Sequence, residues 1–103
     1  MLPNRLELRE KLRVILGNNN TYFQPPENVK MSYPCAVYSF EDILQRYANN
    51  KVYQYDRRYT ITFISHDPDN LYYEGMIDNF DHVEFDRRYV ADNLYHDVFT
   101  VYF

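Results

Sequence analysis

Glycine, cysteine and tryptophan are scarce in this sequence of 103 residues, which has two Gly, one Cys and no Trp. A Rossmann fingerprint or a P-loop needs several glycines, because the backbone must close on phosphate. The two glycines therefore exclude nucleotide-cradling loops. The single thiol, Cys35, allows neither an internal disulfide nor a thiolate metal cluster, so we expect a reduced, cytosolic setting.

Long apolar runs are also missing. The N-terminus reaches a charged residue at Arg5 without an apolar segment, and the longest uninterrupted apolar run is residues 35–38. A secretory signal needs an apolar h-region, and a membrane helix needs about 20 apolar residues. We therefore expect no signal peptide and no membrane span. The length predicts one domain over residues 1–103 with a modest core.

Basic residues are nearly absent from the last third of the chain. Residues 66–103 contain only Arg87 and Arg88 against nine acidic residues, a charge of −7, whereas the whole chain has −4. A negative surface repels phosphate, so this charge disfavours a nucleic-acid reader. The simplest interpretation is a solvated acidic face that aids solubility.

Two helices of about three turns each are predicted. The first begins at Asn4, which has capping-box spacing to Glu7, and ends at Gly17, where a left-handed residue is expected. The apolar stripe of this helix comprises Leu8, Leu12, Ile15 and Leu16. The second begins at residues 67–69, where a proline and two acids favour a helix start. Its apolar face comprises Tyr72, Tyr73, Met76, Ile77 and Phe80.

Strands are predicted by apolar runs and by alternation. Residues 18–34 contain Pro25 and Pro26 and predict an ordered, aromatic loop. Residues 35–38 predict a short buried strand. Residues 40–49 fit either a helix or an extended arm that returns through residues 48–51, and we favour the arm.

The remaining strands are clearer. Residues 53–65 alternate with a period of two and predict one long strand. Residues 82–89 and 95–103 predict two more strands, joined by a tight turn at residues 91–93. The order is therefore α-β-β-α-β-β.

This order predicts an α+β fold with a four-stranded, mainly antiparallel sheet and two helices on one face. In the last strand Phe99 and Val101 point to one face and Val98 and Tyr102 to the other, so both faces are apolar. The second face is covered by the long loop of residues 18–34, by the arm, or by another chain. We favour another chain, because tyrosine is enriched in interfaces.

An Asp-Arg-Arg-Tyr motif occurs twice, at residues 56–59 and 86–89. The first copy opens a predicted strand and the second closes one, which argues against a duplication. Arg58 and Arg88 either form ion pairs with acids across strands or subunits, or belong to an alternating surface charge.

No group of residues predicts catalysis, so we expect no enzyme. Residues 66–69 resemble a cation-binding loop, but helix capping accounts for their acids and the sharp turn lacks a glycine. His82 and His96 lack a nucleophile with an orienting acid. Cys35 lies in an apolar strand, where a thiol usually serves packing. We expect no cofactor and no metal.

Three segments have a composition that general fold physics does not require. They are residues 22–38, with Pro-Pro-Glu-Asn and Tyr-Pro-Cys; residues 47–53, Tyr-Ala-Asn-Asn-Lys-Val-Tyr; and residues 86–99. Together they resemble small tail-terminator proteins of long-tailed bacteriophages, also called tail-completion or minor capsid proteins. The resemblance covers nearly the whole chain.

The resemblance implies a structural protein of the virion tail, at its head-proximal end, that resides in the host cytoplasm during assembly. Such proteins form a homohexameric ring on the last ring of the tail tube, stop tube polymerisation and offer the joining surface to the head connector. The implied partners are further copies, the major tail tube protein, head connector proteins and passing genome DNA without specific binding. The alternatives are a head-side connector component and a small non-catalytic binding domain.

A ring closes through a head-to-tail interface, and we expect the arm of residues 41–54 to reach the neighbouring subunit. Three acids, Asp78, Asp81 and Glu84, are hypothesised to line the channel so that DNA slides past without adhering. DNA passage that is unchanged by charge reversal at these positions would contradict this hypothesis. The candidate subunit or tube contacts are Tyr47, Asn49, Lys51, Tyr53, Tyr55, Arg58, Arg88, Tyr95 and Tyr102.

Overall fold

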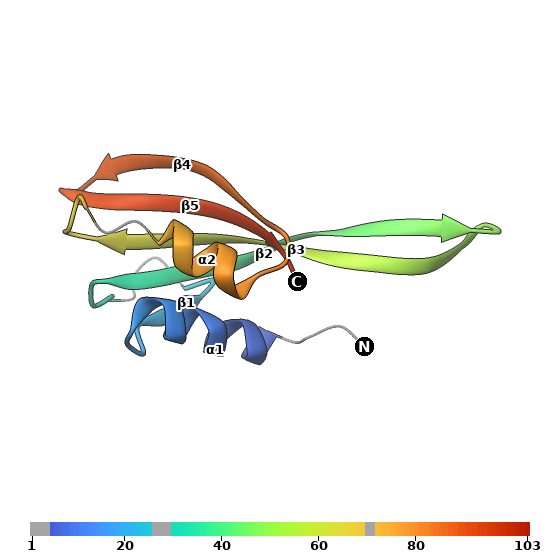
Figure 1. Ribbon diagram of the computed structural model, residues 1–103, viewed down its shortest axis with the longest axis horizontal. Helices are drawn as coiled ribbons and strands as arrows, with labels where there is room; N and C mark the ends of the chain where they lie inside the picture. Colours follow the sequence, from blue (N-terminus) through green and yellow to red (C-terminus); the bar gives the residue numbers. More distant parts are fainter. Residues whose placement is uncertain (1–4, 26–29, 70–71) are drawn as a thin grey trace.

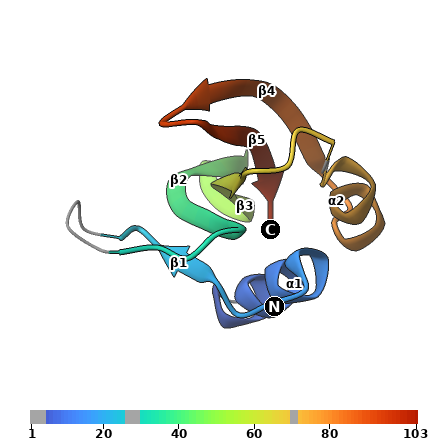
Figure 2. The ribbon, with the colours of Figure 1, turned by 90° about the vertical axis from the view of Figure 1, so that its left-hand side faces the viewer.

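Two helices and five strands make up the computed structural model, which describes residues 5–25, 30–69 and 72–103. The elements are α1 (Arg5–Leu16), β1 (Thr21–Phe23), β2 (Cys35–Ala48), β3 (Lys51–Ser65), α2 (Tyr73–Asn79), β4 (Val83–Ala91) and β5 (Leu94–Tyr102). The strands form one sheet in the order β1-β2-β3-β5-β4 (Figures 1 and 2). Strand β1 is parallel to β2, and the other neighbours are antiparallel. Both helices contribute to one core on the same face of the sheet.

The predicted four-stranded, mainly antiparallel sheet with the order α-β-β-α-β-β is wrong. The segment predicted as a loop contains β1, which pairs in parallel with residues 36–38 and makes the sheet mixed and five-stranded. The N–H of Ala36 donates to the carbonyl of Asn20, and the N–H of Gln24 donates to the carbonyl of Tyr38, both at 2.9 Å. A strand of three residues is too short to have a visible period, but it satisfies buried backbone groups at the edge of β2.

Helix α1 agrees with its prediction. Leu8 and Leu12 are fully buried, and Ile15 and Leu16 pack against the same core. Gly17 has φ +81°, and its N–H donates to the carbonyl of Arg13 at 2.8 Å, so it ends the helix in the left-handed conformation. The predicted capping box includes Asn4, which lies outside the described residues.

Helix α2 is shorter than predicted, with seven residues. Residues 67–69 form a turn instead of a first helical turn, in which the N–H of Asp69 donates to the Asp67 carboxylate at 2.9 Å. A short helix lays only one row of side chains on the sheet, which comprises Tyr72, Met76 and Phe80. Tyr73 and Ile77, predicted on the same buried face, remain 49% and 45% exposed.

Strands β2 and β3 run far beyond the rest of the molecule as a two-stranded arm (Figure 1). The molecule consequently measures 51 × 30 × 23 Å. Asn49 and Asn50, with φ of 52° and 63°, connect the strands in the left-handed conformation typical of a type I′ hairpin turn. The preference for an arm over a helix at residues 40–49 is confirmed, and β2 is one continuous strand of 14 residues.

Strands β4 and β5 form the second hairpin. Asp92 and Asn93, with φ of 53° and 61°, make the tight turn that was predicted there. A register shift between Phe85 and Arg87 marks a β-bulge in β4. Because β4 pairs only with β5, it is an edge strand of the sheet.

The second face of the sheet is covered in part by the chain itself. Tyr22 and Met31 pack on a small cluster of buried side chains there. The hydroxyl of Tyr22 also accepts a hydrogen bond from the N–H of Ser32 at 3.0 Å. At this end of the sheet Tyr22 and Met31 supply the cover, as predicted for the segment that contains them, and the preference for another chain is wrong there. The cluster comprises Cys35, Ile64 and Leu94.

We predict that Gly75→Ala lowers the free energy of unfolding by about 1 kcal/mol. A methyl group at Gly75 would lie 2.9 Å from Cγ2 of Ile15, so the glycine lets α2 approach α1. The alanine gains about 1 kcal/mol in helix propensity, but the overpacking costs about 1–3 kcal/mol. Urea denaturation measures the difference. In an Ile15→Ala background the same substitution should be neutral or stabilising, and an equal loss in both backgrounds would refute the contact.

Candidate functional site

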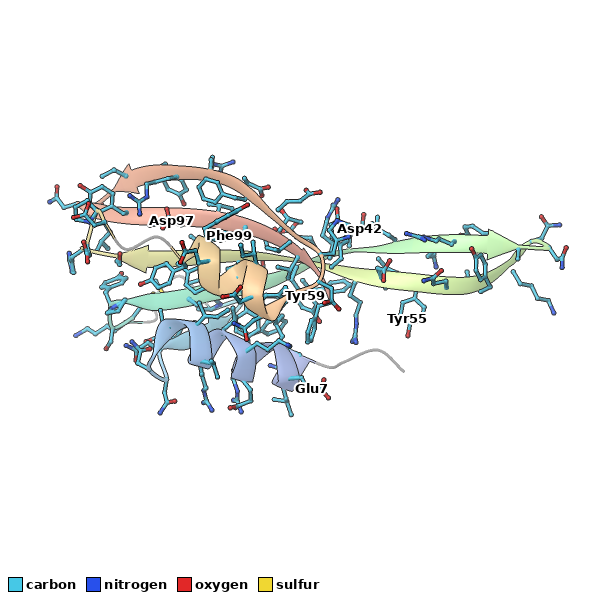
Figure 3. All side chains as sticks on the ribbon, viewed as in Figure 1. Glu7, Asp42, Tyr55, Tyr59, Asp97 and Phe99 are labelled. Atoms are coloured by element: carbon cyan, nitrogen blue, oxygen red, sulfur yellow. The ribbon has the colours of Figure 1, made fainter. Side chains whose placement is uncertain are left out.

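The arm has two different faces, which follow from the strand register. On one face Ile43 lies opposite Arg57, Gln45 opposite Tyr55, and Tyr47 opposite Val52; on the other, Asp42 lies opposite Arg58 and Arg46 opposite Gln54. Figure 3 shows Tyr55 and Asp42 on opposite sides of the ribbon. We call the first the apolar face of the arm (Ile43, Tyr47, Val52 and Tyr55) and the second its charged face (Asp42, Arg46, Asp56 and Arg58).

The side chains of the apolar face are open to solvent. Tyr47 is 61% exposed, and Ile43, Val52 and Tyr55 are 44–47% exposed. Tyr53, 63% exposed, lies in the register shift near the tip. Scattered exposed apolar side chains are ordinary, but several on one face of a ribbon form a patch of the kind that marks an interaction site. A two-stranded ribbon in water is also only marginally stable alone.

This apolar face is a continuation of the core. Phe40 lies opposite Tyr59, and their rings meet edge to face with centroids 5.7 Å apart. Tyr59 is buried under the helices, whereas Phe40 is 40% exposed at the base of the arm. The same face of β2 and β3 therefore passes from the helix-covered core to open solvent (Figure 3), and on the arm it carries Arg57 and Gln45 among its apolar side chains.

The charged face of the arm contains two ion pairs. Arg58 Nη2 lies 3.6 Å from Asp42 Oδ2, and Arg46 Nη2 lies 3.9 Å from Asp56 Oδ2. Exposed pairs of this kind contribute about 0–1 kcal/mol. The interpretation of Arg58 as a cross-strand ion pair is confirmed within the chain. Lys51, beside the turn, has no ion-pair partner among the described residues.

A stronger ion pair lies at the opposite end of the sheet. Arg88 donates to both carboxylate oxygens of Asp97, from Nε at 2.6 Å and from Nη2 at 3.1 Å, and its Nη1 donates to the carbonyl of Pro68. Asp97 is only 2% exposed, and the guanidinium stacks over the ring of Tyr95. The hydrogen bonds to Asp97 raise the pKa of Arg88 above its usual value. Arg88 therefore also pairs across strands, as one interpretation predicted.

The nine predicted contact residues consequently separate into three groups. Arg88 and Tyr95 belong to the intrachain cluster around Asp97, at the end of the sheet away from the arm (Figure 3). Arg58 and Tyr102 lie near the base of the arm, where Tyr102 packs on His82 with ring centroids 4.2 Å apart. The remaining five lie on the arm and are exposed: Tyr47, Asn49, Lys51, Tyr53 and Tyr55.

Four exposed apolar residues of this region were missed by the sequence analysis. Once residues 40–49 are treated as a strand, alternation across the register shift would have placed two of them on the apolar face. The other two are exposed at the base and on the charged face, where a sequence pattern does not distinguish them from core positions. They are Ile43 and Val52 on the apolar face, Phe40 at the base and Leu44 on the charged face.

The three acids predicted to line a channel are all exposed. Asp78 lies in α2, Asp81 in the connection that follows and Glu84 in β4. Glu84 Oε1 is 3.7 Å from Nε2 of His82. The structure places them along one continuous segment, and their role in a channel stays a prediction.

The described residues offer little for small-molecule chemistry. Within residues 5–25, 30–69 and 72–103, no group of three or more His, Cys, Asp or Glu is placed to hold a metal ion. Burial raises the pKa of the Cys35 thiol to about 11, so it stays protonated at neutral pH. A cavity of about 180 Å³ opens between α2 and β4. Neither α1 nor α2 has the length and apolar character of a membrane-spanning helix.

We predict that Arg88→Gln destabilises the fold by about 3 kcal/mol, because it leaves the buried carboxylate of Asp97 without its partner. The matched control is Arg87→Gln. Arg87 is exposed and only stacks over Tyr89, so its loss should cost less than about 1 kcal/mol. Urea denaturation of both variants measures the difference, and equal effects would contradict a structural role for the Arg88–Asp97 pair.

Comparisons with known proteins do not assign this chain to a family. A scan against models of protein families found no match, and a search of curated protein sequences found none. A function is therefore inferred from the chain itself, whose most prominent feature is the exposed apolar arm.

Proposed function

We propose that this protein is a structural subunit that assembles head to tail into a ring and, as a tail terminator of a long-tailed bacteriophage, stops growth of the tail tube. The observation that carries the proposal is the arm, whose apolar face is exposed beyond the part of the sheet that the helices cover. The ring would offer its outer end to the head connector and would let genome DNA pass. Its place is the head-proximal end of the virion tail.

The arm supports assembly for an energetic reason. Burying apolar surface contributes about 25 cal/mol per Å², and the arm presents four large apolar side chains on one face that the chain leaves 44–61% exposed. An isolated two-stranded ribbon is only marginally stable in water, and covering its exposed apolar surface with a partner would lower its free energy. A projecting element that binds a different surface of the next copy produces a closed ring when the rotation between copies closes.

Two other functions fit the geometry less well. A small binding domain should have a concave, mostly apolar pocket of about 300–1,000 Å³. The apolar cavity between α2 and β4 measures about 180 Å³, and two larger hollows, of about 300 and 480 Å³, are lined in large part by polar and charged side chains. A head-side connector component is associated with mainly helical or small barrel folds, whereas this chain has a five-stranded sheet with two helices. The tail-terminator role itself rests on the resemblance of residues 22–38, 47–53 and 86–99.

The test replaces residues 45–55 by Asn-Gly. Leu44 and Asp56 are partners in the β2–β3 register, so a two-residue type I′ turn can join them without disturbing the rest of the sheet. Because residues 45–55 are all exposed, we expect the core to fold as before. We expect the shortened chain to lose the six-fold species in native mass spectrometry and to leave the length of growing tail tubes unrestricted in electron micrographs.

A second variant separates the reach of the arm from its apolar contact. It keeps the arm at full length but changes Ile43, Tyr47, Val52 and Tyr55 to threonine, which favours strands but removes most of the apolar surface. We expect this variant to lose ring formation and tube capping as well. If the shortened chain still forms a six-fold species and still stops tube growth, the proposed function is wrong.

A further inference from the structure

A second exposed apolar patch lies on the body of the molecule, where α2 meets β4. Tyr73, Ile77 and Phe85 are 44–49% exposed, and the rings of Tyr73 and Phe85 meet edge to face with centroids 6.4 Å apart. Tyr73 and Ile77 are four residues apart, so they share one face of α2. We call this patch, together with the neighbouring acids Glu74 and Asp78, the α2–β4 surface.

The charges of this surface and of the arm are complementary. Residues 72–86, which form the α2–β4 surface and its surroundings, contain five acidic residues and no Lys or Arg. Residues 43–55 of the arm contain Arg46 and Lys51 and no acidic residue. The register places Arg46 and Lys51 on the face of the ribbon opposite Tyr47 and Tyr55, so the complementarity is one of overall potential and not of facing ion pairs. Complementary potentials favour the correct partner and register of a contact.

A cavity in the α2–β4 surface is suited to a tyrosine side chain. It has a volume of about 180 Å³ and is lined by the aromatic rings of Tyr72, Tyr73, Phe85 and Phe99. Asp97 borders it, but its carboxylate is buried and held by Arg88, so the walls open to a ligand are apolar. An aromatic ring buries its area against such walls. The apolar face of the arm supplies two exposed tyrosines, Tyr47 and Tyr55.

We propose that the arm of one copy docks on the α2–β4 surface of a second copy of this chain. Tyr47 or Tyr55 enters the cavity, and the rest of the apolar face covers Tyr73, Ile77 and Phe85. Arg46 and Lys51, on the other face of the ribbon, give the arm a positive potential that complements Glu74 and Asp78. The arm extends away from its own α2, so the contact joins two molecules (Figure 1). This inference rests on the proposed function, because it names the subunit contact of that ring.

The contact is heterologous, since the arm and the α2–β4 surface are different parts of the chain. Each subunit therefore uses its arm toward one neighbour and its α2–β4 surface toward the other. The proposal assigns Asp78 to this contact instead of to the channel. Asp81 and Glu84 keep their predicted place in the channel wall.

Mixing two complementary variants tests the contact. The arm variant carries Tyr47→Ser and Tyr55→Ser, and the surface variant carries Glu74→Lys and Asp78→Lys. Each should be monomeric alone, because each has lost one half of the interface. When the two are mixed, the intact arm of the surface variant should bind the intact α2–β4 surface of the arm variant. The altered arm and the altered surface that remain should prevent a third copy from binding. We expect a 1:1 heterodimer and no larger species in native mass spectrometry.

Compensation and a matched control complete the experiment. Arg46→Glu with Lys51→Glu, placed in the same chain as Glu74→Lys with Asp78→Lys, should restore assembly at least tenfold over either reversed pair alone. Glu10→Lys with Asp69→Lys makes the same change in net charge at exposed acids outside the surface, and it should assemble like the wild type. Assembly that falls equally in this control would mean that net charge alone is responsible and would overturn the proposal.

Because the ring can require the tube end as a template, the mixture is also examined in the presence of purified tail tubes. There the contact is detected by cross-linking with a carbodiimide, which joins lysines to carboxylates in direct contact. A mixture that gives no 1:1 species in either condition overturns the proposed contact. Surface variants that assemble like the wild type but no longer stop tube growth would show that the tube protein binds the α2–β4 surface. This result would also overturn the proposed contact between the arm and that surface. If the two variants form the 1:1 species but the wild-type chain leaves tube growth unrestricted, the proposed function is refuted and the proposed contact is not.

Discussion

The alternation of apolar side chains along β3 is the constraint on which the rest of the structure depends. Tyr59, Ile61 and Phe63 are at most 3% exposed, and they pack between β2 and β5 under both helices. Phe63 stacks on Tyr72 and meets Phe99 edge to face, so this one strand ties α2 to the far half of the sheet. Because a one-residue slip would turn these side chains to the other face, their burial also determines the register of the neighbouring strands.

The arm follows from the same register. Pairing with β2 continues past the last helix-covered positions to Lys51, with register shifts between Phe40 and Asp42 and between Arg46 and Tyr47. The face that forms the core thus continues into the exposed apolar face of the arm. The helices end where the body ends, since α1 has 12 residues and α2 has seven. The molecule thus presents apolar surface where it has no cover of its own. A chain that assembles with copies of itself can use such surface, because each copy supplies the cover that the next one lacks.

The charged side chains are of two kinds: some form a buried ion pair that stabilises the fold, and others are exposed on the surface. Arg88 and Asp97 form an ion pair within the chain, in which the guanidinium compensates the charge of a buried carboxylate. The acids of α2 and the cations of the arm are exposed and sit beside apolar side chains on two different surfaces. The two copies of the Asp-Arg-Arg-Tyr motif therefore have different roles. Arg58 forms a weak pair at the base of the arm, and Arg88 anchors the edge strand β4.

Local patterns in the sequence determined α1 with its terminal Gly17, the long strand ending at Ser65, the turn at Asp92 and Asn93, and the exposed position of the arm tyrosines. Such features depend on neighbours within a few residues, which a sequence pattern records directly. Tertiary structure alone decided three others. Thr21–Phe23 is a strand because it pairs with the edge of β2, and α2 begins later than predicted. Asp97 is the partner of Arg88 because the bulge between Phe85 and Arg87 sets the register of the β4–β5 hairpin. Each depends on contacts between segments whose approach is determined by the packing of the whole sheet.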